Sequence, residues 1–120
     1  MTLPKPPVQS VQQGVTVLSL GQTLENIDEI AMGTLRTSLP DLASSVTPPR
    51  LVLDMSGVAF FGSSFIELLF IISKRLGDRN GKFAISGLSP HCAEVLHITH
   101  LDHVWTIRGS VTEAVDAIKD

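Results

Sequence analysis

Short apolar runs alternate along the chain with longer segments in which apolar residues recur at helical spacing. Residues 51–54 (LVLD) and 82–86 (KFAIS) are short and mostly apolar, which is typical of strands covered on both faces in a parallel sheet. Residues 8–20 alternate around Gly14 and therefore predict two short strands or one hairpin. Residues 104–107 (VWTI) predict a final strand.

Four segments between and after these strands have the spacing and the start signals of helices. The first is expected to carry Ile27, Ile30 and Leu35 on one side, and a further helical turn is expected over residues 41–45. The predicted start signals are Asn26, Ser64, Ser89 before Pro90, and Ser110, and the first two helices are expected to end near Pro40 and at about Leu76.

The alternation of strands and helices predicts parallel pairing through crossover helices. The expected fold is a small open α/β sandwich with four or five mostly parallel strands, an N-terminal hairpin and about four helices. Residues 1–7 contain three prolines and are expected to form a flexible tail, and residues 8–120 are expected to form a single domain. Sites in such sheets usually lie beyond the carboxyl ends of the strands, and the segment over residues 54–63 leaves one of these ends.

Composition narrows the classes of function. The formal net charge is −3 and no cluster of lysine and arginine is present, so nucleic-acid binding is not expected. The single cysteine excludes an internal disulfide. The N-terminus lacks the apolar region of a signal peptide, and the longest apolar run is too short to span a membrane. A cytoplasmic protein without membrane association is the expectation.

The segment from Asp54 to Ser64 carries the candidate chemistry. Ser64 and Glu67 have the spacing of a capping box, so Ser64 is predicted to be the N-cap of the second long helix. Ser63 would then lie one residue outside the helix with its hydroxyl free. A phosphate on Ser63 would face the free N–H groups and the positive end of the helix dipole. The alternative is that both serines only cap the helix.

Other residues of this segment are expected to shape the turn. Asp54 and Ser56 follow the strand and can hydrogen-bond to nearby backbone N–H groups, while Gly57 and Gly62 supply backbone freedom. Asp54 has no paired acid or base nearby, and no nucleophile elbow or phosphate-binding glycine loop is present, so no enzyme activity is expected. The four histidines lack an acidic or thiolate partner at ligand spacing, so no metal or cofactor is expected.

The second long helix also suggests a docking surface. At 100° per residue, one stripe collects Ser63, Glu67, Phe70, Ile71 and Lys74. Its charged members should face solvent, which would leave the two apolar residues at the edge of the exposed face, as in a partner-binding surface with a polar rim. The alternative is that neighbouring elements cover both apolar side chains.

The segment contains the pattern Asp-x-Ser-x-Val-x-Phe-x-x-Ser-Ser, formed here by Asp54, Ser56, Val58, Phe60, Ser63 and Ser64. This pattern resembles the STAS domain family, which includes anti-sigma factor antagonists. The resemblance implies that a serine-kinase anti-sigma factor binds the unmodified chain and phosphorylates it, and that a serine phosphatase resets it. Ser63 would be the phosphoacceptor, with Ser64 less favoured. A monomer and a homodimer both stay open.

Two positions depart from the family pattern. Gly62 stands where the family usually has Asp, and Phe65 stands where it usually has Gly. Gly62 removes a carboxylate from the turn, and Phe65 is expected to alter the docking surface. These differences support an alternative function, in which the domain is a scaffold or ligand-binding module that is never phosphorylated.

Overall fold

A five-stranded sheet forms the centre of the computed structural model, which describes residues 8–20 and 26–119. The first two strands pair antiparallel as a hairpin, and the remaining pairs are parallel. This arrangement confirms the expected α/β fold class. The sheet has the order β1-β2-β4-β6-β7, formed by β1 (Val8–Gln12), β2 (Val15–Ser19), β4 (Arg50–Asp54), β6 (Lys82–Ser86) and β7 (Thr106–Arg108), while β3 (Asn26–Ile27) and β5 (Phe60–Phe61) pair parallel in a second, two-stranded sheet.

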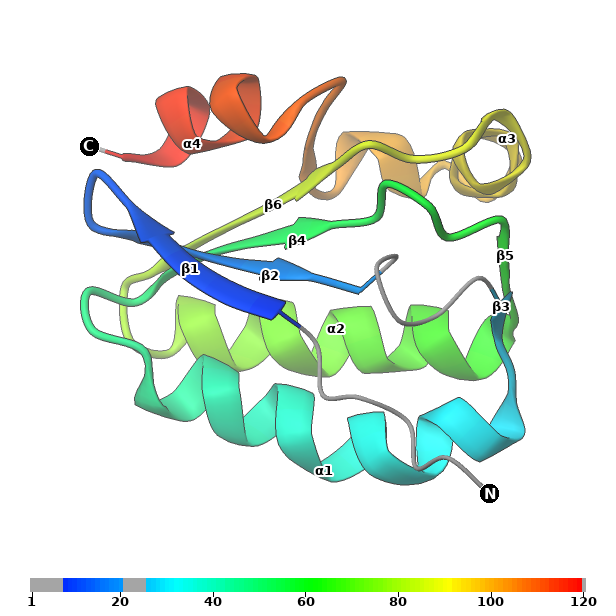
Figure 1. Ribbon diagram of the computed structural model, residues 1–120, viewed down its shortest axis with the longest axis horizontal. Coiled ribbons are helices and arrows are strands. Elements are labelled where there is room, and N and C mark those ends of the chain that lie inside the picture. The colour runs from blue at the N-terminus through cyan, green and yellow to red at the C-terminus, as the bar shows by residue number, and fades with distance from the viewer. Residues whose placement is uncertain (1–7, 21–25, 120) are drawn as a thin grey trace.

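Helices cover both faces of the large sheet (Figure 1). Two long helices lie side by side on one face, with the N-terminal end of each beside the two-stranded sheet, and a short helix lies on the other face. Among the described residues, none of these helices combines the length and the apolarity that a membrane span requires. The helices are α1 (Glu29–Ser45), α2 (Ser63–Gly77), α3 (Pro90–Ile98) and α4 (Val111–Ile118), with a 3-10 helix, η1 (Leu101–His103), after α3.

The continuous apolarity of β4 is explained by its place in the sheet. Leu51 and Leu53 point into the larger core, between the sheet and helices α1 and α2, whereas Val52 points into the smaller core under α4. All three side chains are fully buried. The strand ends beside β6, where Asp54 is paired with Ser86. The carboxyl ends of the central strands therefore meet at one edge of the sheet.

The first helix differs from its prediction. Asn26 does not cap a helix but pairs with Phe60 as part of β3, and the N-cap is Asp28, whose Oδ1 accepts a hydrogen bond from the Ala31 backbone N–H (3.0 Å). The helix also continues through Pro40, so the separate turn predicted over residues 41–45 is its last turn. Pro40 is buried inside α1, which packs against α2, and the helix continues although proline donates no backbone hydrogen bond.

The burial of this segment also corrects the prediction. Ile27 and Leu35 are buried, but Ile27 belongs to a strand, and Ile30 on the first turn of α1 is 83% exposed. The observed starts of the later elements agree better with their predictions. Ser89 and Ser110 cap α3 and α4 as predicted, and β7 begins at Thr106, two residues later than predicted. The tail at residues 1–7 and the connector at residues 21–25 lie outside the described residues.

Candidate functional site

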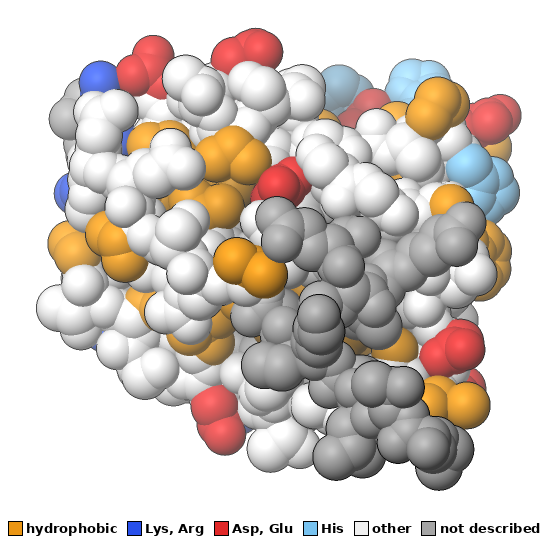
Figure 2. Space-filling view, in the orientation of Figure 1, with side chains coloured by type: hydrophobic (Ala, Val, Ile, Leu, Met, Phe, Trp, Pro, Cys, Tyr) orange, Lys and Arg blue, Asp and Glu red, His pale blue; other side chains and the backbone are white. Residues whose placement is uncertain are grey.

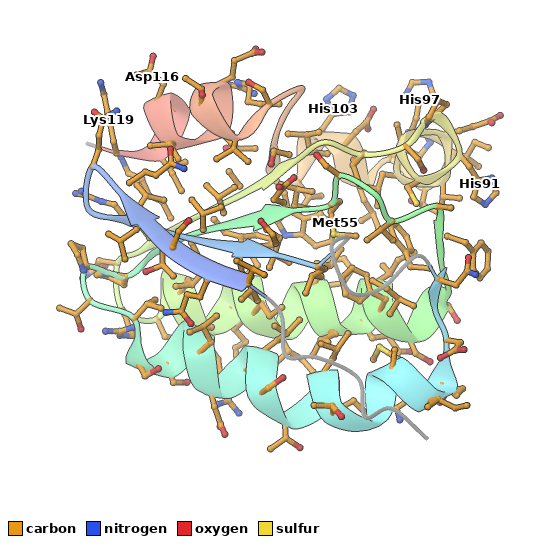
Figure 3. All side chains as sticks on the ribbon, in the orientation of Figure 1. Met55, His91, His97, His103, Asp116 and Lys119 are labelled. Carbon is orange, nitrogen blue, oxygen red and sulfur yellow. The ribbon has the colours of Figure 1, made fainter. Side chains whose placement is uncertain are left out.

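The N-terminal end of α2 follows a turn that is tied to both neighbours of β4. The carbonyl of Asp54 accepts a hydrogen bond from the Leu20 N–H (3.1 Å), and the Met55 N–H donates to the carbonyl of Ser86 (2.8 Å). Met55 is fully buried at this end of the strand (Figure 3). The turn therefore starts from a fixed point at the carboxyl edge of the sheet.

Side chains hold the first part of the turn. The Asp54 carboxylate accepts hydrogen bonds from the Ser56 backbone N–H at Oδ1 (3.1 Å) and from the Ser19 hydroxyl at Oδ2 (3.2 Å). Gly87 lies against Ser56 in this turn and has a φ of +69°. A Cβ on Gly87 would lie only 2.2 Å from Ser56 Oγ. Gly87 was not predicted as a site residue, because this close approach depends on the pairing of β4 with β6.

The two glycines of the turn differ. Gly57 has a φ of +93°, so it uses the conformational freedom that the sequence predicted. Gly62 has an extended backbone, with a φ of −97° and a ψ of −178°, which any residue can adopt. No neighbouring atom lies within 4 Å of the position that a Cβ on Gly62 would take. The predicted need for glycine at position 62 is therefore wrong.

The start of α2 also differs from its prediction. Gly62 is the N-cap, and no side chain in the described part of the chain caps the helix. The Gly62 carbonyl already accepts a hydrogen bond from the Phe65 N–H (3.1 Å), so Ser63 is the first residue of the helix. The capping box is not formed, because the Ser64 hydroxyl instead donates to Glu29 Oε1 (3.1 Å) at the start of α1.

Ser63 is the serine with an available hydroxyl. Its residue is exposed, and its side chain makes no hydrogen bond to any of the described residues. It lies on the first turn of a 15-residue helix, where backbone N–H groups have no side-chain acceptor. This end of the helix has the positive partial charge of the dipole. The arrangement can accommodate an added anion on Ser63 without rearrangement of the turn.

The predicted stripe of α2 is exposed. Ser63, Glu67 and Lys74 face solvent, and Phe70 and Ile71 are 47% and 45% exposed. Neighbouring elements therefore leave about half of both apolar side chains uncovered. Phe70 is supported from one side by Trp105, with ring centroids 5.0 Å apart in an edge-to-face arrangement.

Phe65 lies in the core and not on this surface. It is fully buried and packs against Phe61 of β5, with ring centroids 5.2 Å apart. The prediction that Phe65 alters the docking surface is wrong, since its side chain points away from solvent. Phe60, which was predicted only as part of the sequence pattern and not as a surface residue, is 46% exposed beside the start of α2 and stacks on His91 of α3 (centroids 5.7 Å apart).

Histidines gather on and after α3 at the same end of the molecule (Figures 2 and 3). Asp102 Oδ2 lies 2.9 Å from His97 Nδ1, and its Oδ1 lies 3.8 Å from His103 Nε2. The hydrogen bond to His97 holds the pKa of Asp102 below its usual value. Within residues 8–20 and 26–119, no three histidine, cysteine or acidic side chains converge as metal ligands.

Comparisons with known proteins agree with this architecture. The family model described as the STAS domain matches residues 7–114. The anti-sigma-F factor antagonist RsfB of Mycobacterium tuberculosis is 26% identical over 106 residues, which cover 88% of this chain and 83% of that protein.

Two solved structures are also similar. An anti-sigma-factor antagonist (STAS) domain protein from Planctomyces limnophilus superposes with a TM-score of 0.88 at 32% identity, over 97% of this chain and 100% of that one. An anti-sigma factor antagonist from Mycobacterium paratuberculosis superposes with a TM-score of 0.80 at 26% identity, over 95% of this chain and 93% of that one. The match along nearly the whole sequence shows that the chain belongs to the STAS domain family.

Proposed function

We propose that this protein is an anti-sigma factor antagonist, which binds a serine-kinase anti-sigma factor and is released when Ser63 is phosphorylated. The observation that carries the proposal is the exposed hydroxyl of Ser63, which has no hydrogen-bond partner among residues 8–20 and 26–119, at the head of a stripe that contains Phe70 and Ile71. The names of the similar proteins support the antagonist role. The domain acts by binding, and catalysis belongs to its partners.

The stripe has the composition of a docking surface. Two half-exposed apolar side chains, Phe70 and Ile71, lie between the exposed charges of Glu67 and Lys74. Apolar anchors surrounded by polar residues are typical of protein–protein interfaces. Trp105 behind Phe70 limits the freedom of that ring, which lowers the entropy lost when a partner covers it.

Phosphorylation changes the charge of this surface. Transfer forms a bond between Ser63 Oγ and the γ-phosphorus of ATP, breaks the bond from that phosphorus to the leaving oxygen of ADP, and passes the hydroxyl proton to a base of the kinase. The product adds about −1.5 to −2 charges beside the apolar anchors. Desolvation of the phosphate and repulsion from an acidic partner surface would weaken the complex, and a serine phosphatase would restore it.

The experiment is a binding measurement followed by phosphorylation. The anti-sigma factor that binds the unmodified chain is identified by pull-down and purified. Its Kd is then measured for the parent chain, for Ser63→Ala and for Ser63→Glu. We expect the alanine variant to bind normally and the glutamate variant to bind at least about tenfold more weakly. Ser10→Glu adds the same charge on the distant, exposed strand β1 and should have little effect. A complex that forms, yet yields no phosphate on either serine with ATP, would refute the switch.

A second candidate is a scaffold or ligand-binding module that never receives phosphate. The observation in its favour is Gly62, which leaves the first turn of α2 without an acidic or capping side chain. Under this alternative, the partner would bind Ser63→Ala and Ser63→Glu with equal affinity. The same Kd measurement therefore separates the two functions.

A further inference from the structure

Glu29 connects the starts of the two long helices. Its Oε1 accepts the hydrogen bond from the Ser64 hydroxyl (3.1 Å), and its Oε2 accepts one from Arg36 Nη2 (3.0 Å). Glu29 is the first residue of α1, so this contact joins α1 to the first turn of α2 across 35 positions of sequence. The carboxylate therefore stands beside one of two adjacent serines.

The two serines differ in their surroundings. Ser64 is a partly exposed residue whose hydroxyl donates to Glu29, whereas Ser63 is exposed and makes no side-chain hydrogen bond to the described residues. Hydrogen bonds from Arg36 and Ser64 hold the pKa of Glu29 below its usual value, so the group is a carboxylate at neutral pH. A kinase that reaches this turn therefore meets one free hydroxyl and one that is already engaged.

We infer that Glu29 is a specificity-determining residue that directs phosphorylation to Ser63 and away from Ser64. The inference rests on the proposed phosphorylation switch and identifies how that switch selects its serine. Phosphoryl transfer to Ser64 would remove the hydroxyl group that donates the hydrogen bond to Glu29, and would place the new phosphate against the carboxylate. Transfer to Ser63 breaks no contact of this kind and places the phosphate at the start of the helix, where it is stabilised.

Arg36 is the group that could oppose this effect. Its guanidinium is already bound to Glu29, and it would have to exchange that carboxylate for a phosphate on Ser64. The Arg36 side chain is 52% exposed and the Glu29 side chain 73%, so both partners are partly screened by solvent. We expect the repulsion to exceed the rearrangement of Arg36, and low ionic strength gives the clearest measurement.

The first test needs no kinase. Phosphoserine is introduced during translation at position 63 or 64 of the full chain, either in the parent sequence or in the Glu29→Gln variant, and thermal unfolding is followed by circular dichroism. Glutamine retains one oxygen that can accept from Ser64, but it removes the charge and the second oxygen, which accepts from Arg36. We expect phosphoserine at 64 to lower Tm by about 3–6 °C in the parent sequence and by half of that or less in Glu29→Gln.

Phosphoserine at 63 should leave Tm unchanged or raise it slightly, and Glu29→Gln should not alter that result. Asp41→Asn removes an exposed charge from the same helix and should not relieve the loss caused by phosphate at 64. An unchanged or increased Tm with phosphoserine at 64, or a loss that Glu29→Gln leaves intact, would overturn the inference.

The second test uses the anti-sigma kinase and ATP, with the modified serines counted by mass spectrometry. We expect the ratio of Ser64 to Ser63 phosphorylation to rise about tenfold in Glu29→Gln and to stay constant in Asp41→Asn. The same ratio in Glu29→Gln as in the parent chain would refute the role of Glu29. Absence of phosphate from both serines in every variant would refute the proposed switch, and the Tm measurements would then show separately whether Glu29 opposes a phosphate on Ser64.

Discussion

Replacement of Gly62 by Asp is expected to stabilise the fold. The backbone at this N-cap is extended and the space around its Cβ position is open, so the new side chain meets no steric cost. Loss of the glycine restricts the unfolded chain, which contributes about 0.4–1 kcal/mol. A carboxylate at this position adds a few tenths of a kcal/mol as a cap and about 0.3–1 kcal/mol through the helix dipole.

These contributions sum to about 1–2 kcal/mol in the free energy of unfolding. Urea unfolding measured by circular dichroism detects a change of this size as a higher midpoint at constant slope. Gly62→Ala is the matched control, because it restricts the unfolded chain but cannot cap the helix. The excess of Asp over Ala should decrease as salt is added, since the dipole term is screened. An aspartate variant no more stable than the alanine variant would refute the assigned N-cap.

Further substitutions test the structure at single positions. Gly87→Ala should reduce stability by about 1–3 kcal/mol in urea unfolding, because φ is +69° and the new Cβ would lie 2.2 Å from Ser56 Oγ. Gly33→Ala, at an unobstructed helix position, should not reduce stability. Equal effects of the two substitutions would contradict this geometry. Phe65→Ala should cost about 3–5 kcal/mol of unfolding free energy. Phe70→Ala should cost much less stability and instead weaken partner binding; the reverse order would be contrary to their burial. The pKa of Asp102 is lowered in the fold, so its stabilising effect is present above its ordinary value of 3.8 and is lost as pH falls below it. Asp102→Asn should therefore reduce the fall of Tm at acidic pH. The same fall of Tm in the variant as in the parent chain would show that Asp102 does not contribute to this pH dependence.

The sequence predicted best those elements whose signals are local. The bounds of β6 were predicted without error, because KFAIS is a short apolar run placed between a turn and a helix cap. Ser89 and Ser110 cap their helices as predicted, since in each case the hydrogen bond joins residues three apart. The exposed stripe of α2 likewise follows from helical periodicity alone.

The errors arose where a distant part of the chain decides the outcome. Ile27 fits the apolar face of a helix as well as a strand, and only its pairing with Phe61 in β5 makes it a strand residue. Ser64 has the local spacing of a cap, but its hydroxyl instead donates a hydrogen bond to Glu29, 35 positions away. Gly87 could not be identified from spacing, because Ser56 approaches it only through the register of β4 and β6. The local sequence pattern identifies the helices and strands, and tertiary contacts determine where they begin and end.

The frame around Ser63 also constrains how a switch at this position can work. The turn before α2 is tied to β2 and β6 through Asp54, Met55 and their partners, and the first turn of the helix is anchored by the buried ring of Phe65. A phosphate on Ser63 would need no strand or helix to move, because the hydroxyl already lies at the surface. Control at this site would therefore act through charge on a preformed surface and not through a change of fold. Phosphorylated and unmodified chains should consequently show the same pattern of slow amide exchange in β4 and β6, while partner affinity differs between them.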